Sequence, residues 1–513
     1  MPRITRKTTE KNSINRLIFV GLTILVQIAL ILLIPLGIGT YYADIYIIMG
    51  FAGVICALLI NTRDINAQYK IVWIILILIA PVFGVMLYLM FGSPSILYPM
   101  RKMYERASGQ YNEYRIQDEK ILEEIKSKSL HICNQVKYIN MYGKYPIYKN
   151  TKVDYFDDAE AAYESQIDDI KKARSYIFME YHAISEEPSI KELEELLVRK
   201  ASEGVKVRII YDDLGCVGFL NKDYPKRLNE KGIECLVFNP MVPVVKGFLN
   251  NRDHRKITVI DGKIGYTGGY NIAEEYFNRK EMYGHWKDCG IKMEGDAVKG
   301  LLVIFLEMWT AILDKTESLE KYLPTQECKI ISEGYVLPYA DFPLDSENTG
   351  RNVYLNIIKS ATRYVHIMTP YLIIDDEVIS ELNLAAKRGV DVKIITPGIP
   401  DKKLVYAATR SYYPTLVSSG VCIFEYSPGF SHGKFVVADD EVAAIGTINF
   451  DFRSFYFHFE NAVFMYNVKA IYDIERDFQE TILFCRSVSN KYKFRPVIVR
   501  LRDGLLRMIA PLF

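Results

Sequence analysis

The chain has 513 residues, which is too long for one ordinary hydrophobic core and therefore predicts two or more globular units. Half of the residues are hydrophobic, and they concentrate before residue 92, so the chain divides into a membrane part and a globular part with the charge mix of a soluble protein. A formal net charge of +1 argues against a dedicated nucleic-acid binder, which usually carries a strong basic excess.

The eight cysteines are scattered along the chain, without a C-x-x-C pair or a ligand-like cluster. This spacing argues against a zinc site and against a disulfide framework. Because eight thiols would be awkward in an oxidising compartment, the globular part is predicted to lie in the cytoplasm.

Three apolar runs stand near the N-terminus, at residues 17–38, 45–60 and 71–91. The first and third are long enough to cross a hydrocarbon core of about 30 Å as helices, whereas the second is marginal. The first run is too long for a cleaved signal peptide and lacks a small-residue cleavage site, so it is predicted to remain as an anchor.

Basic residues flank these runs unevenly: they precede the first run, separate the second from the third and follow the third, while the loop 39–44 has no Lys or Arg. The positive-inside rule then puts all the basic flanks in the cytoplasm, which three full crossings cannot satisfy. Either the second run and its neighbour form an incomplete hairpin, or the catalytic part faces outward. We favour a multi-pass protein of the cell membrane with a cytoplasmic catalytic part.

The globular part contains an internal repeat, which indicates duplication of one unit. Each copy reads strand, helix, strand, at residues 174–181, 190–201 and 204–210 in the first copy and 363–371, 378–386 and 389–395 in the second. The second strands are alike, GVKVRII and GVDVKII. This order predicts a parallel or mixed α/β sheet with crossover helices.

A five-residue motif, H-x-K-x4-D-x6-G-x2-N, marks both copies. Its members are His254, Lys256, Asp261, Gly268 and Asn271 in the first copy and His432, Lys434, Asp439, Gly446 and Asn449 in the second. From average residue usage, one copy has a chance on the order of 1 in 10 million per starting position, so coincidence is excluded. His and Lys two apart on a strand point to the same face, and both can then reach one ligand.

These residues resemble the paired HKD motifs of the phospholipase D superfamily. The sequences NRDHRK at 251–256, YTGGYNIAEEY at 266–276 and YDDLG at 211–215 are similar to those of bacterial cardiolipin synthases, and the run 71–91 resembles the last N-terminal helix of that family. The resemblance implies two phospholipase D-like α/β/α sandwich domains related by pseudo-twofold symmetry and preceded by transmembrane helices. The expected divisions are a membrane anchor at 1–95, a linker and first domain at 96–335, and a second domain at 336–513.

The resemblance also implies roles around one phosphodiester. One histidine attacks phosphorus and the other acts as general acid and base, with His254 the favoured nucleophile. The side chains of Lys256, Lys434, Asn271 and Asn449 would stabilise the charged oxygens, and Thr447 would add a hydroxyl donor where the first copy has Gly269. Glu460 and Asp288 would orient the histidines, while Asp261 and Asp439 would brace the motif loops. No metal or cofactor is expected.

The function implied is transfer of a phosphatidyl group between two phosphatidylglycerol molecules, which gives cardiolipin and glycerol through a phosphohistidine intermediate. The donor lipid comes from the resemblance alone. A hydrolytic phospholipase D is the alternative. A nuclease is disfavoured by the apolar runs and the near-neutral charge, and a catalytically dead scaffold by ten intact motif positions. The expected partners are phosphatidylglycerol and the lipid bilayer, without nucleic acid; the oligomeric state is open.

The C-terminal segment 497–513 repeats apolar residues at helical spacing, with arginines between them. An amphipathic helix is therefore predicted. Two interpretations stay open: a helix that packs on the protein core, and an interfacial helix that enters the lipid surface.

Overall fold

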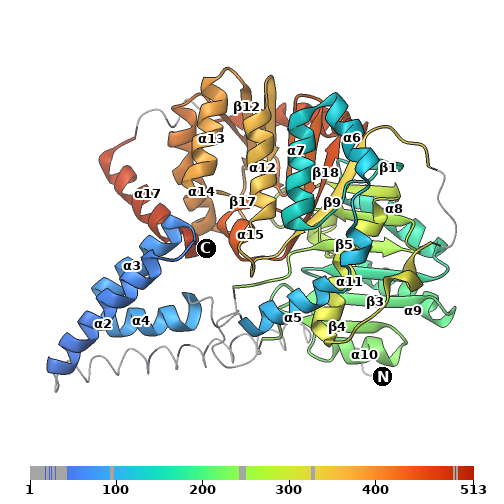
Figure 1. Ribbon diagram of the computed structural model, residues 1–513, viewed down its shortest axis with the longest axis horizontal. Coiled ribbons are helices and arrows are strands. Elements are labelled where there is room, and N and C mark those ends of the chain that lie inside the picture. The colour runs from blue at the N-terminus through green and yellow to red at the C-terminus, as the bar shows by residue number, and fades with distance from the viewer. Residues whose placement is uncertain are drawn as a thin grey trace.

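The computed structural model describes residues 43–92, 98–241, 250–324, 330–488 and 495–512, together with the single residues 18, 22, 25, 29 and 492. The body consists of two β-sheets with flanking helices, and an arm of helices from the N-terminal region projects from one side (Figure 1). Apart from four positions, the first apolar run lies outside the described residues, so its prediction as a membrane helix is untested.

The arm consists of a helical hairpin followed by two shorter pieces, α2 (Ala43–Asn61), α3 (Ala67–Ile79), α4 (Pro81–Leu87) and the π-helical turn η1 (Tyr88–Gly92). The prediction of one continuous helix over 71–91 is wrong. The chain leaves helical geometry at Ala80 and restarts at Pro81, because proline has no N–H to continue a helix but suits a first turn. Over the described ranges, no helix combines the length and the apolar character needed to span a bilayer.

Short helices then connect the arm to the body: α5 (Tyr98–Gly109), η3 (Asn112–Arg115), α6 (Glu119–Lys128), α7 (Leu130–Tyr138) and η4 (Ile139–Gly143). They contact both halves of the body. Arg115 pairs with the buried Glu307 of the first half. Tyr104 stacks on Phe342 of the second half with ring centroids 4.1 Å apart. The linker is thus part of the folded core.

The first sheet has seven strands in the order β1-β8-β6-β5-β2-β3-β4, in which only β2–β3 and β3–β4 are parallel. Its strands are β1 (Thr151–Phe156), β2 (Tyr176–Tyr181), β3 (Lys206–Asp212), β4 (Glu234–Phe238), β5 (Lys256–Ile260), β6 (Ile264–Gly268) and β8 (Gly290–Gly295). Its helices are α8 (Ala159–Lys172), α9 (Pro188–Ser202), α10 (Tyr224–Glu230), η6 (Glu274–Phe277), α11 (Val298–Leu313) and η7 (Leu319–Tyr322).

The second sheet repeats this order with one more edge strand, β19-β13-β12-β10-β15-β16-β18-β9. Its strands are β9 (Tyr335–Asp341), β10 (Tyr364–Met368), β12 (Asp391–Pro397), β13 (Cys422–Tyr426), β15 (Phe435–Ala438), β16 (Val442–Gly446), β18 (Glu460–Tyr466) and β19 (Cys485–Ser487). Its helices are α12 (Thr349–Ser360), α13 (Asp376–Lys387), α14 (Lys403–Val417), α15 (Phe452–Tyr456), α16 (Ala470–Ile482), α17 (Val497–Ile509) and η9 (Ala510–Leu512). Two small pairs lie outside the sheets: β11 (Leu372–Ile373) with β17 (Phe450–Asp451), and β7 (His285–Lys287) with β14 (Gly429–Ser431).

The predicted duplication and the mixed α/β sheets are confirmed. The predicted helices correspond to α9 and α13, and each is followed by a glycine with positive φ, Gly204 at +90° and Gly389 at +92°, which suits the left-handed residue that ends a helix. The buried α11 packs on its own sheet and on β9, while α16 packs on its own sheet and on β1. This exchange of contacts is reciprocal, as a pseudo-twofold relation between the halves requires.

Candidate active site

The aspartates of the two motifs brace the sheets. In β5–β6 the carboxylate of Asp261 accepts three backbone N–H bonds, each 2.8 Å long, from the segment 174–176 that leads into β2. Asp439 does the same for residues 362–364 before β10, at 2.7 to 2.8 Å. Both aspartates have positive φ, which Asp tolerates in a tight turn. Their geometry agrees with the bracing role that the resemblance implied.

The two motif histidines precede the central strands. We predicted that His and Lys would share the face of a strand, and this is wrong: β5 begins at Lys256, and β15 begins at Phe435, after both His432 and Lys434. The histidine segments pair with the opposite repeat instead. The backbone N–H of His254 donates to the carbonyl of Phe459 at 2.9 Å, and that of His432 donates to the carbonyl of Lys287 at 2.6 Å.

Each motif imidazole is hydrogen-bonded to a carboxylate of the other repeat. Nδ1 of His254 lies 2.9 Å from Oε2 of Glu460, and Nδ1 of His432 lies 2.6 Å from Oδ2 of Asp288. Both carboxylates are fully buried. An Nδ1–H that donates to a carboxylate leaves the lone pair on Nε2, which is the atom that can attack phosphorus or take a proton. The site is therefore incomplete in either repeat alone.

The carboxylate of Glu460 is held by hydroxyl groups. Thr447 and Ser454 both donate to it, the latter at 2.7 Å. The hydroxyl of Thr447 therefore donates to the carboxylate in this structure, and its donation to a phosphate stays a prediction. In the other half-site a Cβ at Gly269 would lie 2.1 Å from Oδ1 of Asp288, so only glycine fits there. This close approach explains why the first copy has Gly269 where the second copy has Thr447.

The motif lysines are buried at the centre. Nζ of Lys256 donates to the carbonyl of His254 at 2.6 Å, and Lys434 makes the same bond to His432. Burial lowers the pKa of Lys256 to about 7 and that of Lys434 to about 8. Burial, and after it the neighbouring lysine, also lowers the pKa of His432 to about 4, and burial places the pKa of His254 well below its ordinary value. Both imidazoles are thus neutral near pH 7.

The two motif asparagines differ in whether their side-chain amides are hydrogen-bonded within the protein. The amide of Asn271 is committed to the protein, because its oxygen accepts from Ala183 N–H at 3.1 Å and its NH₂ donates to the Tyr276 hydroxyl at 2.7 Å. Asn449 is buried, and its Oδ1 has no hydrogen-bond partner among the described residues. Only Asn449 is therefore placed with a polar atom uncommitted.

The segment that leads into the first motif is anchored by the YDDLG sequence. Asp212 at the end of β3 accepts from the guanidinium of Arg252 at 2.8 Å, from the N–H of Asp253 at 3.1 Å and from the N–H of Gly215 at 2.9 Å. All of these groups except Gly215 are buried. Asp212 thereby fixes the two residues immediately before His254.

Sequence reasoning missed two histidines that surround His254. The rings of His182 and His458 lie 5.1 Å and 5.5 Å from it, centroid to centroid. His432 is surrounded by aromatic rings instead, with Trp286 at 5.0 Å and Tyr276 at 5.4 Å. The sequence did offer one indication of these two residues, because histidine is rare in this chain, with only seven in all. The two half-sites are chemically unequal.

One group in the described part of the chain could hold a metal ion, because His254, His458 and Glu460 bring three ligand atoms within 4.8 Å of one another. The donor set does not fit a resident cation well. Glu460 is already hydrogen-bonded by His254, Thr447 and Ser454. The two buried ammonium groups nearby favour an anion.

Two buried lysines, two neutral imidazoles and two orienting carboxylates form a centre suited to a phosphodiester. The fold is that of a solved phosphatidylserine synthase from Haemophilus influenzae Rd KW20, with a TM-score of 0.55 and 16% identity over 74% of this chain and 99% of that one. The likeness at this identity concerns the fold.

The family model described as cardiolipin synthase, PLD-like domain, matches residues 166–309 and 354–482, and the phospholipase D-nuclease N-terminal model matches residues 50–93. The cardiolipin synthase 2 of Bacillus anthracis is 32% identical over 89% of each chain. The cardiolipin synthase of Geobacillus sp. (strain WCH70) is 31% identical over 92% of this chain and 95% of its own. The chain belongs to the cardiolipin synthase family with the PLD-like domain, and it is an enzyme of this type. This assignment makes phosphatidyl transfer in phospholipid synthesis the class of reaction that the enzyme catalyses.

Proposed function

We propose that the enzyme transfers the phosphatidyl group of one phosphatidylglycerol to the glycerol hydroxyl of a second, which forms cardiolipin and releases glycerol. The observation that carries the proposal is the crossed pairing of His254 with Glu460 and of His432 with Asp288 around the buried Lys256. Two imidazoles that face one phosphate, each oriented by a carboxylate, suit a reaction in which one alcohol leaves and another enters.

In the first step Nε2 of one histidine attacks phosphorus, and the P–O bond to the leaving glycerol breaks. The opposite histidine gives an Nε2 proton to that oxygen, so this imidazole is protonated in the enzyme–lipid complex, a form that the negative charge of the bound phosphodiester favours. In the second step the same histidine takes the proton of the acceptor hydroxyl, whose oxygen attacks phosphorus while the P–N bond breaks. By family analogy we assign the attack to His254. The lowered pKa of His254 keeps its attacking lone pair available near neutral pH.

The products decide between this function and hydrolysis. Purified protein is incubated with phosphatidylglycerol in detergent micelles, and lipids and free glycerol are quantified. The proposal predicts cardiolipin and glycerol in equal amounts. Formation of phosphatidic acid without cardiolipin would instead identify a hydrolytic phospholipase D.

The rate is expected to fall as pH rises through about 7 to 8. The pKa values of Lys256 and Lys434 are lowered to about 7 and about 8, and an ammonium group is charged only below its pKa. Their loss of charge removes stabilisation of the phosphate oxygens. The measurement is kcat/KM for cardiolipin formation against pH, because this ratio reports the free enzyme. Melting curves at each pH control for unfolding. A rate that stays constant up to about pH 10, the ordinary lysine value, would contradict the assignment.

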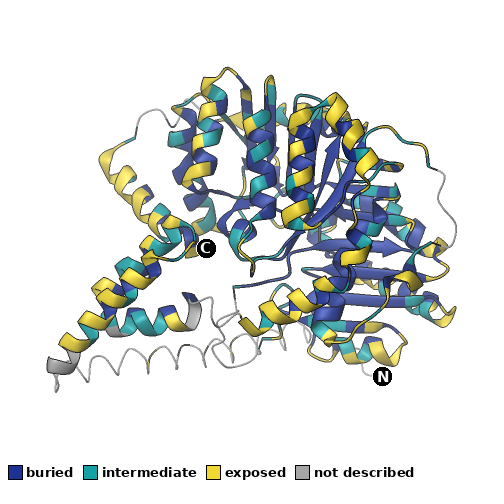
Figure 2. Ribbon diagram, in the orientation of Figure 1, coloured by how far each residue is buried: buried dark blue, intermediate teal, exposed yellow. Residues whose placement is uncertain are grey.

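We further propose that the enzyme acts at the lipid surface, with its catalytic part on the cytoplasmic side as the basic flanks predicted. Exposed residues run along the arm and α17 (Figure 2), and many of them are large and apolar. On α2 these include Ile47, Ile48 and Phe51, and on α3 Ile71 and Ile79. Such a large exposed apolar surface is typical of contact with lipid or with a partner.

The C-terminal helix α17 docks on the body through a face that carries both polar and apolar residues. Asp503 and Leu506 are buried, and Arg507 donates to the carbonyl of Ser411 on α14 at 2.6 Å. Its apolar face points outward, since Ile498 is 74% and Leu501 66% exposed. A helix that packed on the core would bury these residues, so this orientation favours the interfacial interpretation.

Deletion of residues 497–513 is expected to lower activity on bilayer vesicles of phosphatidylglycerol much more than on a short-chain, water-soluble phosphatidylglycerol. The reason is that the exposed apolar face and the arginines beside it attach the active site to the bilayer surface. Initial rates on both substrates are compared for the full chain and the deletion. Equal losses on the two substrates would show that α17 supports the fold instead.

A further inference from the structure

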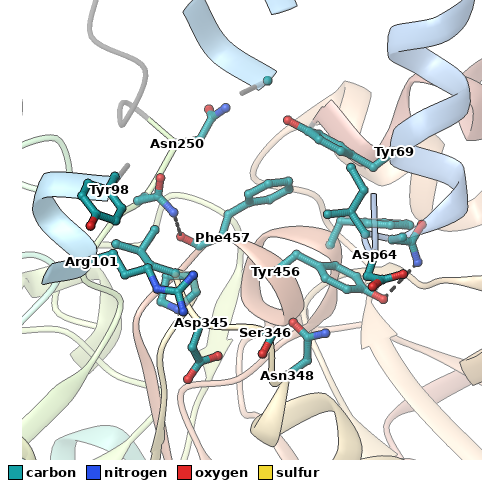
Figure 3. A pocket seen from close by; sticks show the side chains of 17 residues that line it. Asp64, Tyr69, Tyr98, Arg101, Asn250, Asp345, Ser346, Asn348, Tyr456 and Phe457 are labelled. Atoms are coloured by element: carbon teal, nitrogen blue, oxygen red, sulfur yellow. Dashed lines mark hydrogen bonds between the residues drawn. The ribbon is translucent and has the colours of Figure 1, made fainter. Parts of the chain in front are cut away.

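An open pocket of about 260 Å³ lies where the arm meets the second repeat (Figure 3). Its walls come from five stretches of the chain. They are residues 64–69, residue 92 with residues 98–101, residues 250–251, and the segments 343–348 and 452–457 of the second repeat. The arm, whose outer face is apolar, forms one side of this pocket.

The pocket has an aromatic floor and a polar rim. Phe452 is buried, and the half-buried rings of Tyr69, Tyr456 and Phe457 border the same space (Figure 3). Arg101 at the rim is exposed. This combination suits a ligand with a charged group joined to an apolar portion.

Several polar side chains of the pocket are uncommitted. Among the described residues, Asp64, Asn250, Ser346 and Asn348 make no side-chain hydrogen bond or ion pair. The neighbouring Asn251 is different, because its NH₂ donates to the carbonyl of Phe457 at 3.0 Å. The pocket therefore offers free donors and acceptors above a fixed floor.

Two chain segments connect the pocket to the catalytic centre. From Asn251 and Phe457, which line the pocket, they run side by side through the parallel bridge between Asp253 and Phe459 to His254 and Glu460. Three residues of extended chain span about 10 Å. The pocket thus lies about that far from the His254 half-site.

We infer that this pocket holds the acceptor phospholipid through its own phosphate and glycerol backbone, an inference that rests on the proposed function. The acceptor's attacking hydroxyl is five covalent bonds from its phosphorus, on the order of 6 Å, so that phosphate needs a subsite outside the histidine centre. Arg101, whose Nε donates to Glu105 at 2.7 Å in the lipid-free chain, pairs with the phosphate through the rest of its guanidinium, and Asn250 and Ser346 donate to phosphate or ester oxygens. The aromatic floor contacts the start of the acyl chains, which leave towards the arm.

The test separates acceptor binding from formation of the phosphatidyl-enzyme. Cardiolipin formation requires the acceptor lipid, whereas exchange of labelled free glycerol into phosphatidylglycerol requires only the donor. Ser346→Trp, which fills the exposed rim, is expected to lower cardiolipin formation at least about tenfold, equivalent to ~1.4 kcal/mol of acceptor binding. Glycerol exchange should stay near the wild-type rate.

Two further variants complete the experiment. Ser202→Trp, the same change at an exposed serine that ends α9, should alter neither reaction. Asn250→Leu removes a hydrogen-bond donor without added bulk and should also lower cardiolipin formation selectively. It keeps the inference testable if Ser346→Trp fails to fold. Parallel loss of both reactions, or no loss in either, would overturn the inference. A wild-type enzyme that exchanges no glycerol and forms no cardiolipin would contradict the proposed function itself, and this inference with it.

Discussion

Replacing either His254 or His432 with alanine is expected to abolish cardiolipin formation, with a loss of at least about 100-fold in kcat for each variant. In the proposed mechanism one imidazole forms the bond to phosphorus and the other moves the proton, so neither can substitute for its partner. Because each is held by a carboxylate of the other repeat, the second histidine cannot move into the vacated position.

The measurement is the initial rate in phosphatidylglycerol micelles at saturating substrate, together with a thermal melting curve. His131→Ala provides the control, because this histidine is exposed and lies in the linker helix α7. A folded His254→Ala or His432→Ala enzyme that kept more than about a tenth of the wild-type rate would show that the roles are wrongly assigned.

The second large effect is expected at the crossed carboxylates. Glu460→Gln and Asp288→Asn should each lower kcat by at least about 100-fold, because an amide no longer fixes the Nδ1–H tautomer or stabilises an imidazolium. KM should change much less, since neither carboxylate contacts the lipid in this assignment. The two variants keep the size of the side chain, so the packing of β18 and of the segment after β7 is preserved.

The chain supplies a matched control for this experiment. Glu475 on α16 pairs with Nδ1 of His366 at 2.9 Å, the same geometry outside the catalytic centre. Glu475→Gln should leave kcat unchanged. If Glu460→Gln kept as much activity as Glu475→Gln, the carboxylate could not be what orients His254.

Much of the fold could be predicted because each strand and helix of the repeat is encoded in a short stretch of sequence. The strands and helices of both copies follow from apolar periodicity and from glycines such as Gly204 and Gly389, and duplication makes each assignment support the other. The break in the run 71–91 could also have been found, since Pro81 stands inside it. Apolar length alone was a poorer guide than the position of that proline.

The candidate site was predicted in its composition but not in its connections. Motif spacing identified the histidines and the lysines, and the resemblance to the family added the carboxylates Glu460 and Asp288. Spacing cannot reveal that each carboxylate serves the opposite repeat, because that depends on how two surfaces far apart in the sequence dock. The same reason hid His182, His458 and the hydroxyl of Ser454, which reach the centre only through tertiary packing.

The stereochemical course at phosphorus tests the central claim most directly, namely that one centre built from both repeats transfers the phosphatidyl group in two displacements. The donor is a phosphatidylglycerol that carries one sulfur in place of a non-bridging oxygen, with known configuration, and the product is the cardiolipin that retains this phosphorus. Each in-line displacement inverts the configuration, so a phosphohistidine intermediate predicts net retention. Inversion would mean that the acceptor hydroxyl attacks the donor directly, and it would contradict the two-step account.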